Sequence, residues 1–432
     1  MKKTILLGLN ELNFEYIKFY SEKGLLPNFK TIFHNYKVVE TQSEDEYKLL
    51  EPWIQWATIH TGKTFAEHQI FRLGDIVNFK EEQLFETIES HGFSVGAVSP
   101  FNAKNELKNP AFFVPDPWTI TKVSGNWFVQ ALYKAIHQSV NDNASGKLSI
   151  STLATLAIGV LRVVPLKRYP EYLKYFLNRK RPGTKAVILD GLLADTFMFL
   201  FKKHKPDFSN LFLNSGAHIQ HHYLFNSKAY EGEFSNPDWY CEKGYDPLIV
   251  ILKQYDRIIG DLIKSDINLL MATGLHQQPH NNLTFYWRIN KHEEFTQKLG
   301  LDGVDQVLPR MSRDFLIEFN SEENASKGEQ ILNSFVMDKD QLKVFKVDNR
   351  GKSLFIVLIY SSEITEGDSI SSTTTNLIIK NFKNLISFVA IKNGEHNGVG
   401  YFVYDPKKIN TPIPSTIQLK EVRGIIENSI FL

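Results

Sequence analysis

Histidines stand at two informative places along this 432-residue chain, as a cluster of three and as a single residue. His218, His221 and His222 stand within five residues directly after an apolar run, and His396 follows another apolar run near the end of the sequence. Neutral imidazole ligates divalent metals and also serves as an acid or base near neutral pH. A packed structural histidine is the common alternative, so the pattern is consistent both with a metal or catalytic site and with simple packing.

Two carboxylates stand at the boundaries of predicted secondary-structure elements. Glu11 follows the apolar run 3–9, and Glu51 precedes a helix predicted over 53–61. A carboxylate at a helix start is favoured by the helix dipole, so for Glu11 this structural role is the alternative to a role in the site. His276, which follows a later apolar run, is a further candidate for catalysis.

The elements that would carry these residues alternate along the chain. Short apolar runs without polar alternation are typical of buried parallel strands, and amphipathic stretches between them predict helices. A proline near its start and Gly62 just past its end delimit the helix over 53–61, whose free N-terminal N–H groups would make an anion site. This alternation predicts an α/β fold with a mainly parallel sheet. Strands are expected over 3–9, 37–42, 92–100, 206–214 and 267–274, and further helices over 184–204 and within 236–263.

Three segments together resemble one known family. They are the opening TILLGLNELNFEYIKFYSEKGLLPNF with PWIQWATIHTG, the central PDFSNLFLNSGAHIQHHYLF, and the closing GEHNGVGYFVYDP. Their order and places resemble those of the alkaline phosphatase superfamily, in its phosphodiesterase/nucleotide pyrophosphatase branch. The resemblance spans nearly the whole chain. It implies a three-layer α/β sandwich with a mainly parallel central sheet, and an enzyme with two metal ions, commonly zinc, at the carboxyl ends of the strands.

When the family's motif is matched residue by residue to this sequence, only some of the expected metal ligands are present. Asn10 stands where the first Asp of the family is expected, and an Asn oxygen is a poor zinc ligand; Glu11 beside it is the substitute. His221 matches the metal-binding His of the central motif, and His396 matches the late His. A shifted match would put His218 in the central place instead. The usual two-metal site is therefore not expected, although one divalent ion, zinc or manganese, is compatible with these histidines.

The position of the family's Thr or Ser nucleophile falls at Pro52, which has no hydroxyl. Glu51 beside it is expected to act as base or ligand instead. His276 and Gln277 are expected to reach the pocket from the loop that replaces a Ser-Asp-His-Gly motif, and Gln55 matches a position that holds a phosphate oxygen in the family. The expected substrate contacts are then Asn10, Gln55, Gln277, Arg310 and Arg313, with a solvated loop as the alternative for the two arginines.

The composition is that of an ordinary soluble globular protein, with 43% hydrophobic and 22% charged residues. A net charge of +1 gives no general attraction to polyanions, and no nucleic-acid-binding motif is present. Cys241 is the only cysteine, which excludes an internal disulfide and fits a reducing compartment. The first apolar run is too short for a signal peptide, so a cytoplasmic location is expected.

A helical insertion is expected over 120–183. The stretch 162–185 carries eight basic residues, one acidic residue and four interleaved aromatic residues. It fits peripheral contact with the inner membrane face or with an anionic substrate; the alternative is a solvated helical cap whose aromatic residues pack inward. A strand–helix–strand pattern predicts a small α/β accessory subdomain over 301–360. The core then takes residues 1–119, 184–300 and 361–432.

These expectations favour a cytoplasmic enzyme that transfers or hydrolyses a phosphoryl group on a nucleotide- or lipid-linked substrate. A role in surface-glycan assembly is implied by the resemblance alone. The second hypothesis is a metal-independent glycosyl transferase with Glu51 or Glu11 as base, because loss of the nucleophile together with the carboxylate ligands favours repurposing of the fold. The third is a non-catalytic binding protein that keeps the pocket.

Overall fold

The computed structural model describes residues 3–141, 150–309, 313–409 and 412–431. Contacts between residues divide the chain into two compact units. The first unit contains Met1–Glu233, Pro237–Pro279 and Gly394–Leu432, and the second contains Phe234–Asn236 and His280–Asn393. Each histidine and glutamate singled out in the sequence belongs to the first unit.

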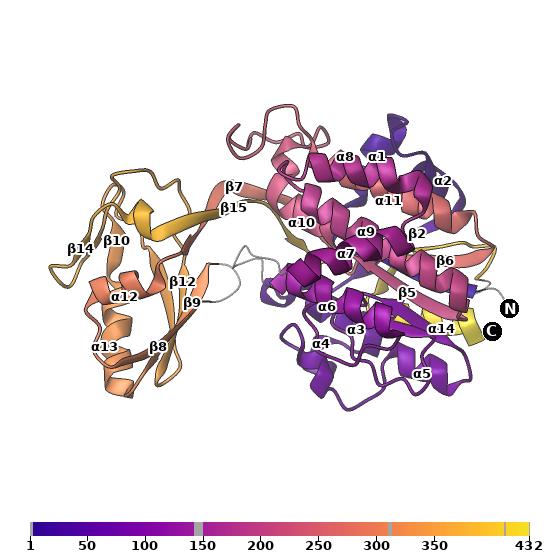
Figure 1. Cartoon of the computed structure of the whole chain (residues 1–432), viewed down its shortest axis with the longest axis horizontal. Coiled ribbons are helices and arrows are strands. Elements are labelled where there is room, and N and C mark those ends of the chain that lie inside the picture. The colour runs from indigo at the N-terminus through magenta and orange to yellow at the C-terminus, as the bar shows by residue number, and fades with distance from the viewer. Residues whose placement is uncertain (1–2, 142–149, 310–312, 410–411, 432) are drawn as a thin grey trace. The chain divides into compact units, whose positions relative to one another are not determined.

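An eight-stranded sheet forms the centre of the first unit (Figure 1). Its strands lie in the order β17 (Thr416–Gln418), β2 (Lys37–Gln42), β16 (Val399–Tyr404), β6 (Ile267–Ala272), β1 (Lys3–Leu9), β5 (Phe208–Leu213), β3 (Val95–Val98) and β4 (Phe112–Val114). Neighbouring strands pair in parallel except at β16, which is antiparallel to β2 and β6. The sheet is therefore mainly parallel, as the alternation of apolar runs and helices predicted.

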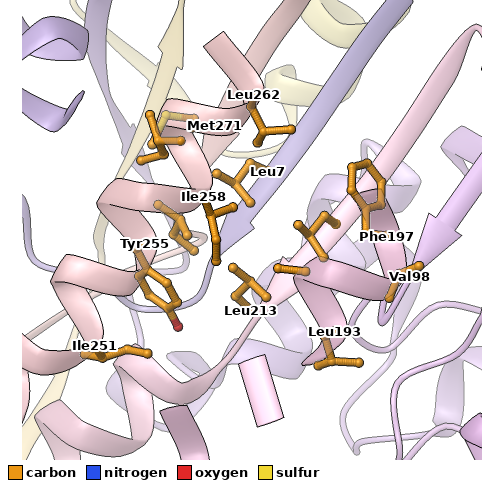
Figure 2. Packing of buried hydrophobic residues seen from close by; sticks show 14 of the residues in the cluster. Leu7, Val98, Leu193, Phe197, Leu213, Ile251, Tyr255, Ile258, Leu262 and Met271 are labelled. Atoms are coloured by element: carbon orange, nitrogen blue, oxygen red, sulfur yellow. The ribbon is translucent and has the colours of Figure 1, made fainter. Parts of the chain in front are cut away.

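Helices cover both faces of this sheet. On one face lie α1 (Phe14–Glu22), α2 (Pro27–Asn35), α6 (Trp127–Asn141), α9 (Thr184–His204) and α11 (Pro247–Ile263), and on the other lie α3 (Pro52–Thr61), α5 (Leu84–Ser90) and α14 (Glu421–Phe431). Side chains alternate along β1, so that Leu7 packs into the first layer while Leu6 packs into the second. Figure 2 shows side chains of α9 and α11 packed over the strands. This arrangement is a three-layer α/β sandwich and confirms the predicted fold class.

The helix predicted over 53–61 is α3, which begins at Pro52. Proline is favoured at the first helical position because its missing N–H would have no partner there. Gly62 ends the helix with φ 66°, in the left-handed region that favours glycine. Within the second layer Trp56 of α3 lies directly over Gly8 of β1, where a Cβ atom would meet the Trp56 ring at 2.7 Å. A glycine in β1 therefore permits the close approach of α3.

The range 120–183, predicted as a helical insertion, carries α6, α7 (Ile150–Val163) and α8 (Tyr169–Leu177). Residues 142–149 lie outside the described part of the chain. Both α7 and α8 pack on α9, and the three helices are labelled in Figure 1. Among the described residues, no helix has the length and apolar character needed to cross a membrane.

The second unit is built from antiparallel sheets. One has the order β11 (Phe345–Asn349), β12 (Ser353–Leu358), β9 (Asp314–Phe319) and β8 (Val304–Pro309), and another has the order β10 (Phe335–Met337), β13 (Ile370–Ser372) and β14 (Ile378–Ile379). Two helices, α12 (His292–Leu299) and α13 (Glu322–Asn333), complete it, and α13 packs on the first of these sheets.

This unit is larger than the predicted range 301–360. The chain enters it along β7 (His276–Ile289) and leaves it along β15 (Ile386–Asn397), and these two strands pair with each other. They are far apart in the sequence, so a pattern read along the chain gives no sign that they pair. The boundary therefore moves outward, to 280–393.

The close contact at Gly8 predicts a loss of stability on substitution. Gly8→Ala is expected to lower the free energy of unfolding by about 1–3 kcal/mol, because the added methyl group would meet the rings of Trp56 and Phe212 at 2.7 and 2.8 Å. Urea denaturation followed by fluorescence measures the change. Gly424→Ala in α14 is the matched control, because nothing lies within 4 Å of its added Cβ. Equal losses in the two variants would contradict this account.

Candidate metal centre

One group of side chains in the described part of the chain has the composition of a metal site. Glu11, His221 and His396 each offer one ligand atom, and these atoms lie within 4.8 Å of one another. Glu11 Oε2 is 2.9 Å from His221 Nε2 and 3.1 Å from His396 Nε2. The two Nε2 atoms are 3.2 Å apart. The fold thus brings together a carboxylate and two histidines that stand far apart in the sequence.

The order of the strands explains this meeting. β1 lies between β5 and β6, and all three are parallel. The residues that follow these strands leave the sheet at the same edge, where α/β proteins usually bind ligands. Glu11 follows β1, His221 lies on α10 (Ser215–Tyr223) directly after β5, and Gln277 follows β6. His396 reaches the same edge from the end of β15.

The far side of each imidazole ring is held by the backbone. His221 Nδ1 is 3.3 Å from the carbonyl oxygen of Gly394, and the His396 ring is hydrogen-bonded to the backbone of Leu50. His396 Nδ1 also lies 3.8 Å from a carboxylate oxygen of Glu51. In a metal-bound state, acceptors at Nδ1 would keep the proton on that nitrogen and leave the lone pair of Nε2 for the metal. Both rings therefore have the orientation that a ligating histidine needs.

Amide side chains also hold the Glu11 carboxylate. Asn10 Nδ2 donates to Oε1 at 2.9 Å, and Gln277 Nε2 donates to Oε2 at 2.6 Å. Trp56 Nε1 in turn donates to Asn10 Oδ1 at 2.8 Å. A neutral amide at position 10 supports Glu11, whereas a second carboxylate in that place would repel it. Asn10 and Gln277, both expected as substrate contacts, are thus engaged with this carboxylate.

The backbone at Glu11 adopts an uncommon conformation. Its φ is 57°, in the left-handed region, which costs a residue with a Cβ roughly 1–2 kcal/mol. Hydrogen bonds to three other residues hold it there. Glu11 N donates to Thr273 O, and the Glu11 carbonyl accepts from Gln277 N and from Gln220 Nε2. Backbone conformations of this kind persist where the surroundings impose them, and they cluster at functional sites.

The charges in the group stabilise one another. Burial opposes the ionisation of Glu11, but His396 and His221 outweigh it and hold the pKa of this carboxyl well below its ordinary value. Burial likewise opposes the charging of His396, but Glu11 and Glu51 outweigh it and raise the pKa of this imidazole. Glu11 is therefore an anion throughout the neutral range, as a metal ligand must be.

The group is buried on one side and open on the other. The Glu11 side chain is 3% exposed, whereas the side chains of His396 and His221 are 14% and 28% exposed. A metal held by three protein atoms, with solvent access on one side, has room for a water molecule or a substrate oxygen. That arrangement is typical of catalytic rather than structural metal sites.

The donor atoms fit one divalent ion. Two ligand atoms about 2.1 Å from a zinc ion at tetrahedral angles lie about 3.4 Å apart. The separations of 2.9, 3.1 and 3.2 Å between the atoms of Glu11, His221 and His396 are slightly shorter, so small outward movements of the side chains would admit the ion. Two imidazoles and one carboxylate form a donor set that suits zinc and is compatible with manganese.

Two other predicted histidines lie outside this group. His276 Nδ1 is 2.6 Å from the carbonyl oxygen of Val399, and its ring stacks on Tyr401. His218 is exposed on α10, and its ring centre lies 4.8 Å from that of His222. Of the two matches considered for the central metal-binding histidine, the geometry brings His221, and not His218, to Glu11.

The remaining predicted contacts lie elsewhere. Gln55 is buried in α3, and its Nε2 donates to Leu49 O at 2.8 Å. Arg313 belongs to the second unit, where its guanidinium lies 4.3 Å from the centre of the Tyr286 ring. Arg310 lies outside the described residues.

Some supporting residues were not found from the sequence. Gln220 bridges two parts of the site, since its Nε2 donates to Glu11 O and its Oε1 accepts from Asn13 N. Asn13 Nδ2 then donates to Gln277 O at 2.9 Å. Amides that orient other residues have no characteristic spacing. The one available sign was that Gln220 stands directly before His221.

Comparisons with known proteins locate similar folds among solved structures. No protein-family model and no curated protein sequence matches this chain. Phosphonoacetate hydrolase from Sinorhizobium meliloti in complex with phosphonoformate is 12% identical, with 99% of this chain and 96% of that chain covered and a TM-score of 0.43. Murine ectonucleotide pyrophosphatase/phosphodiesterase 5 in complex with AMP is 10% identical, with 100% and 96% covered and a TM-score of 0.41. The human protein of that name is 11% identical, with 98% and 94% covered and a TM-score of 0.41.

Both matched proteins belong to the alkaline phosphatase superfamily, in the nucleotide pyrophosphatase/phosphodiesterase branch. Identities near 12% and TM-scores near 0.4 transfer neither an activity nor a ligand set to this chain.

The coupling between Glu11 and His396 can be measured in metal-free protein. Glu11→Gln is expected to lower the pKa of His396, because the carboxylate that raises it is removed. An NMR titration of the imidazole resonances measures this pKa, with His396→Ala to assign the signal. An unchanged His396 pKa in Glu11→Gln would contradict the pairing.

The same pair predicts a pH window for stability. His396 has a raised pKa, so its contribution is full below its ordinary value of 6.5 and is lost as the pH rises through the raised value. Glu11 has a lowered pKa, so its contribution is present above its ordinary value of 4.5 and is lost only in stronger acid. The stability difference between the parent protein and Glu11→Gln should therefore be largest between about pH 4.5 and 6.5, as measured by urea denaturation across pH.

Proposed function

We propose that this protein is an enzyme that acts at the phosphorus of a phosphorylated substrate, with one divalent metal ion, zinc or manganese, held by Glu11, His221 and His396. One observation carries the proposal: these three donors meet at the carboxyl edge of a parallel sheet, with both Nε2 atoms directed at one carboxylate oxygen. The ordered sequence resemblance supports phosphorus as the reacting centre. A divalent ion bound there would neutralise phosphoryl charge and lower the pKa of a water or hydroxyl that it holds.

Glu11 and Glu51 take different roles in this proposal. Glu11 is buried and accepts hydrogen bonds on both carboxylate oxygens, so it serves as a ligand. Glu51 is more open, with its side chain 35% exposed, and stands at the N-terminus of α3. Its carboxylate is placed to accept a proton from a water or an acceptor hydroxyl. The N-terminus of α3 also favours the approach of an anionic phosphoryl group.

The attacking group is proposed to be a water or a substrate hydroxyl. Pro52, at the position of the resembled family's nucleophile, has no hydroxyl and is buried at the start of α3. Thr58 and Thr61 of that helix donate back to the carbonyl oxygens of Ile54 and Ala57. A covalent threonine intermediate is therefore not part of the proposal, and the reaction is a direct displacement that gives either hydrolysis or transfer.

The finer features of the proposal are a nucleotide- or lipid-linked substrate, a part in surface-glycan assembly, and a cytoplasmic location. They are supported by the sequence resemblance and by the single cysteine of the chain. Turnover assays that compare phosphodiesters, nucleotide sugars and lipid-linked diphosphates would separate hydrolysis from transfer and identify the substrate class.

A metal-independent glycosyl transferase is the second candidate. One observation favours it: Glu51 is accessible and lies 3.8 Å from His396 Nδ1, which provides a carboxylate–imidazole pair without a metal. Activity that survives a chelator and is abolished by Glu51→Gln would support this candidate over the first. Turnover of any substrate would exclude a binding protein without catalysis.

Metal content is the first test of the main proposal. Protein purified without chelator is expected to hold about one divalent ion per chain, and His221→Ala and His396→Ala are each expected to lose it. Elemental analysis measures the content. Zinc at a hundred times its dissociation constant should also stabilise the parent fold by about 2.7 kcal/mol, and this gain should disappear in both variants.

His218→Ala is the matched control, because His218 lies on the same helix as His221 but outside the group. The His218→Ala variant is expected to keep the metal. Urea denaturation records any change in its stability. A parent protein without metal, or a variant set in which only His218→Ala loses it, would refute this centre.

Glu51→Gln is expected to separate metal binding from turnover. It should leave the metal content unchanged and lower kcat by about a hundredfold or more, because the base is removed while the ligands remain. Release of 4-nitrophenol from a 4-nitrophenyl phosphodiester, with the metal content measured on the same sample, is the assay. Full activity in Glu51→Gln would remove Glu51 from the mechanism.

A further inference from the structure

Apolar side chains are exposed along the two outer helices of the first unit. They lie on α7, on α8 and on the short turn Leu166–Arg168 between these helices. Each is between 54% and 79% exposed. We call this set the outer patch; it consists of Ile158, Leu161, Leu166, Leu173, Phe176 and Leu177.

The helices of the outer patch are anchored by their opposite faces. Val160 and Val163 of α7, and Tyr169 and Tyr172 of α8, pack into the apolar cluster beneath them. Tyr172 also donates to Asp195 of α9 at 2.8 Å. Both helices pack on α9, and the side chains of the outer patch lie on their exposed faces. The tyrosines thus pack inward as in a helical cap, but the outer patch points outward.

Exposed basic residues belong to the same segment of the chain as this patch. Among the eight basic residues of 162–185, Arg168 is buried and paired with Asp195 and Asp261. The single acid of the stretch, Glu171, faces Arg257 of α11 at 3.6 Å. These pairs leave basic side chains on the outer surface without an acid of the same stretch beside them. The exposed ones are Arg162, Lys167, Lys174, Arg179, Lys180, Arg181 and Lys185.

An exposed tryptophan adjoins the same surface. Trp127, the first residue of α6, is 71% exposed. The guanidinium of Arg162 lies 6.0 Å from the centre of the Trp127 ring and 4.7 Å from that of Phe128. Tryptophan is enriched at the level of lipid headgroups, because its ring is apolar and its N–H is polar.

We propose that the outer patch docks this protein onto a bilayer surface that contains anionic lipids. Helices with exposed Leu, Phe and Trp side chains and a surround of Lys and Arg bind in the headgroup region, where the apolar side chains enter the acyl boundary and the cations meet lipid phosphates. A protein partner fits less well, because lysine is depleted at protein–protein interfaces and several of the exposed cations here are lysines. Several large apolar side chains exposed on neighbouring segments in this way are typical of an interaction site.

The docking proposal does not depend on the metal centre. Lipid binding is measured in an assay that needs no catalytic turnover. A failure of the docking proposal can therefore be distinguished from a failure of the proposed activity. Together the two would place a phosphoryl-acting site on a protein held at a membrane surface, as a lipid-linked substrate requires.

Vesicle flotation with the full chain is the test. The parent protein is expected to float with vesicles of phosphatidylcholine mixed with phosphatidylglycerol, to bind those of phosphatidylcholine alone much more weakly, and to detach as salt is raised. The triple variant Leu173→Ser/Phe176→Ser/Leu177→Ser is expected to weaken binding by about tenfold or more. The variant Lys174→Gln/Lys180→Gln/Arg181→Gln is expected to do the same by weakening the attraction to anionic lipid.

Two controls match these changes elsewhere on the chain. Leu342→Ser/Ile378→Ser removes apolar side chains that are 52% and 58% exposed in the second unit, and Lys202→Gln/Lys203→Gln removes exposed cations at the end of α9. Both are expected to bind like the parent protein. Circular dichroism verifies the fold of every variant, and the charge variant changes only exposed side chains.

Three results would overturn the proposal. The first is no flotation of the parent protein with anionic vesicles. The second is equal binding by the patch variants and their controls. The third is a dimer, seen by light scattering, that the apolar patch variant dissociates while lipid binding is absent; the outer patch would then be an interface between copies of this chain.

Discussion

The buried carboxylate of Glu11 is the constraint on which the candidate site depends. Removing an ionised carboxylate from water costs several kcal/mol unless charges and hydrogen bonds compensate it, and this side chain is only 3% exposed. The compensation comes from two imidazoles, His221 and His396, and from the amides of Asn10 and Gln277. Each of these partners arrives from a different segment of the chain. A divalent cation would supply the same compensation more strongly, which is why a cluster of this kind is suited to bind one.

The partners can meet because neighbouring strands hold one register. Leu9 of β1 lies opposite Leu213 of β5, and Gly8 lies opposite Ala272 of β6, so the three strands end at the same level. A shift by one residue would turn every side chain to the other face of the sheet. At the end of β1 the left-handed backbone of Glu11 then sets the direction of its side chain. The geometry of the site is thus a consequence of strand pairing together with one enforced backbone turn.

Much of this arrangement could be predicted from the sequence, because buried strands and amphipathic helices have their own periodicities. The parallel sheet, the helix now seen as α3, and the choice of His221 over His218 all follow from local patterns and from an ordered resemblance. The supporting amides do not, since the role of Gln220 depends on where Glu11 lies in space. The bounds of the second unit could not be predicted for the same reason, because β7 and β15 pair across about a hundred residues of intervening chain. Contacts between distant segments leave no periodic signal.

The net charge of +1 does not describe the local surface charge that a binding partner would contact. Charges more than about 8–10 Å from a partner are largely screened at physiological salt, so the local surface decides the encounter. The acids beside the outer helices are engaged internally: Asp195 of α9 and Asp261 of α11 pair with buried Arg168, and Glu171 of α8 faces Arg257. The acids of this region therefore neutralise cations that lie inward. The exposed cations are not neutralised by these acids, so their positive potential extends into the solvent. A nearly neutral chain can in this way present a strongly basic face, and that segregation, rather than the sum, determines which surfaces it can approach.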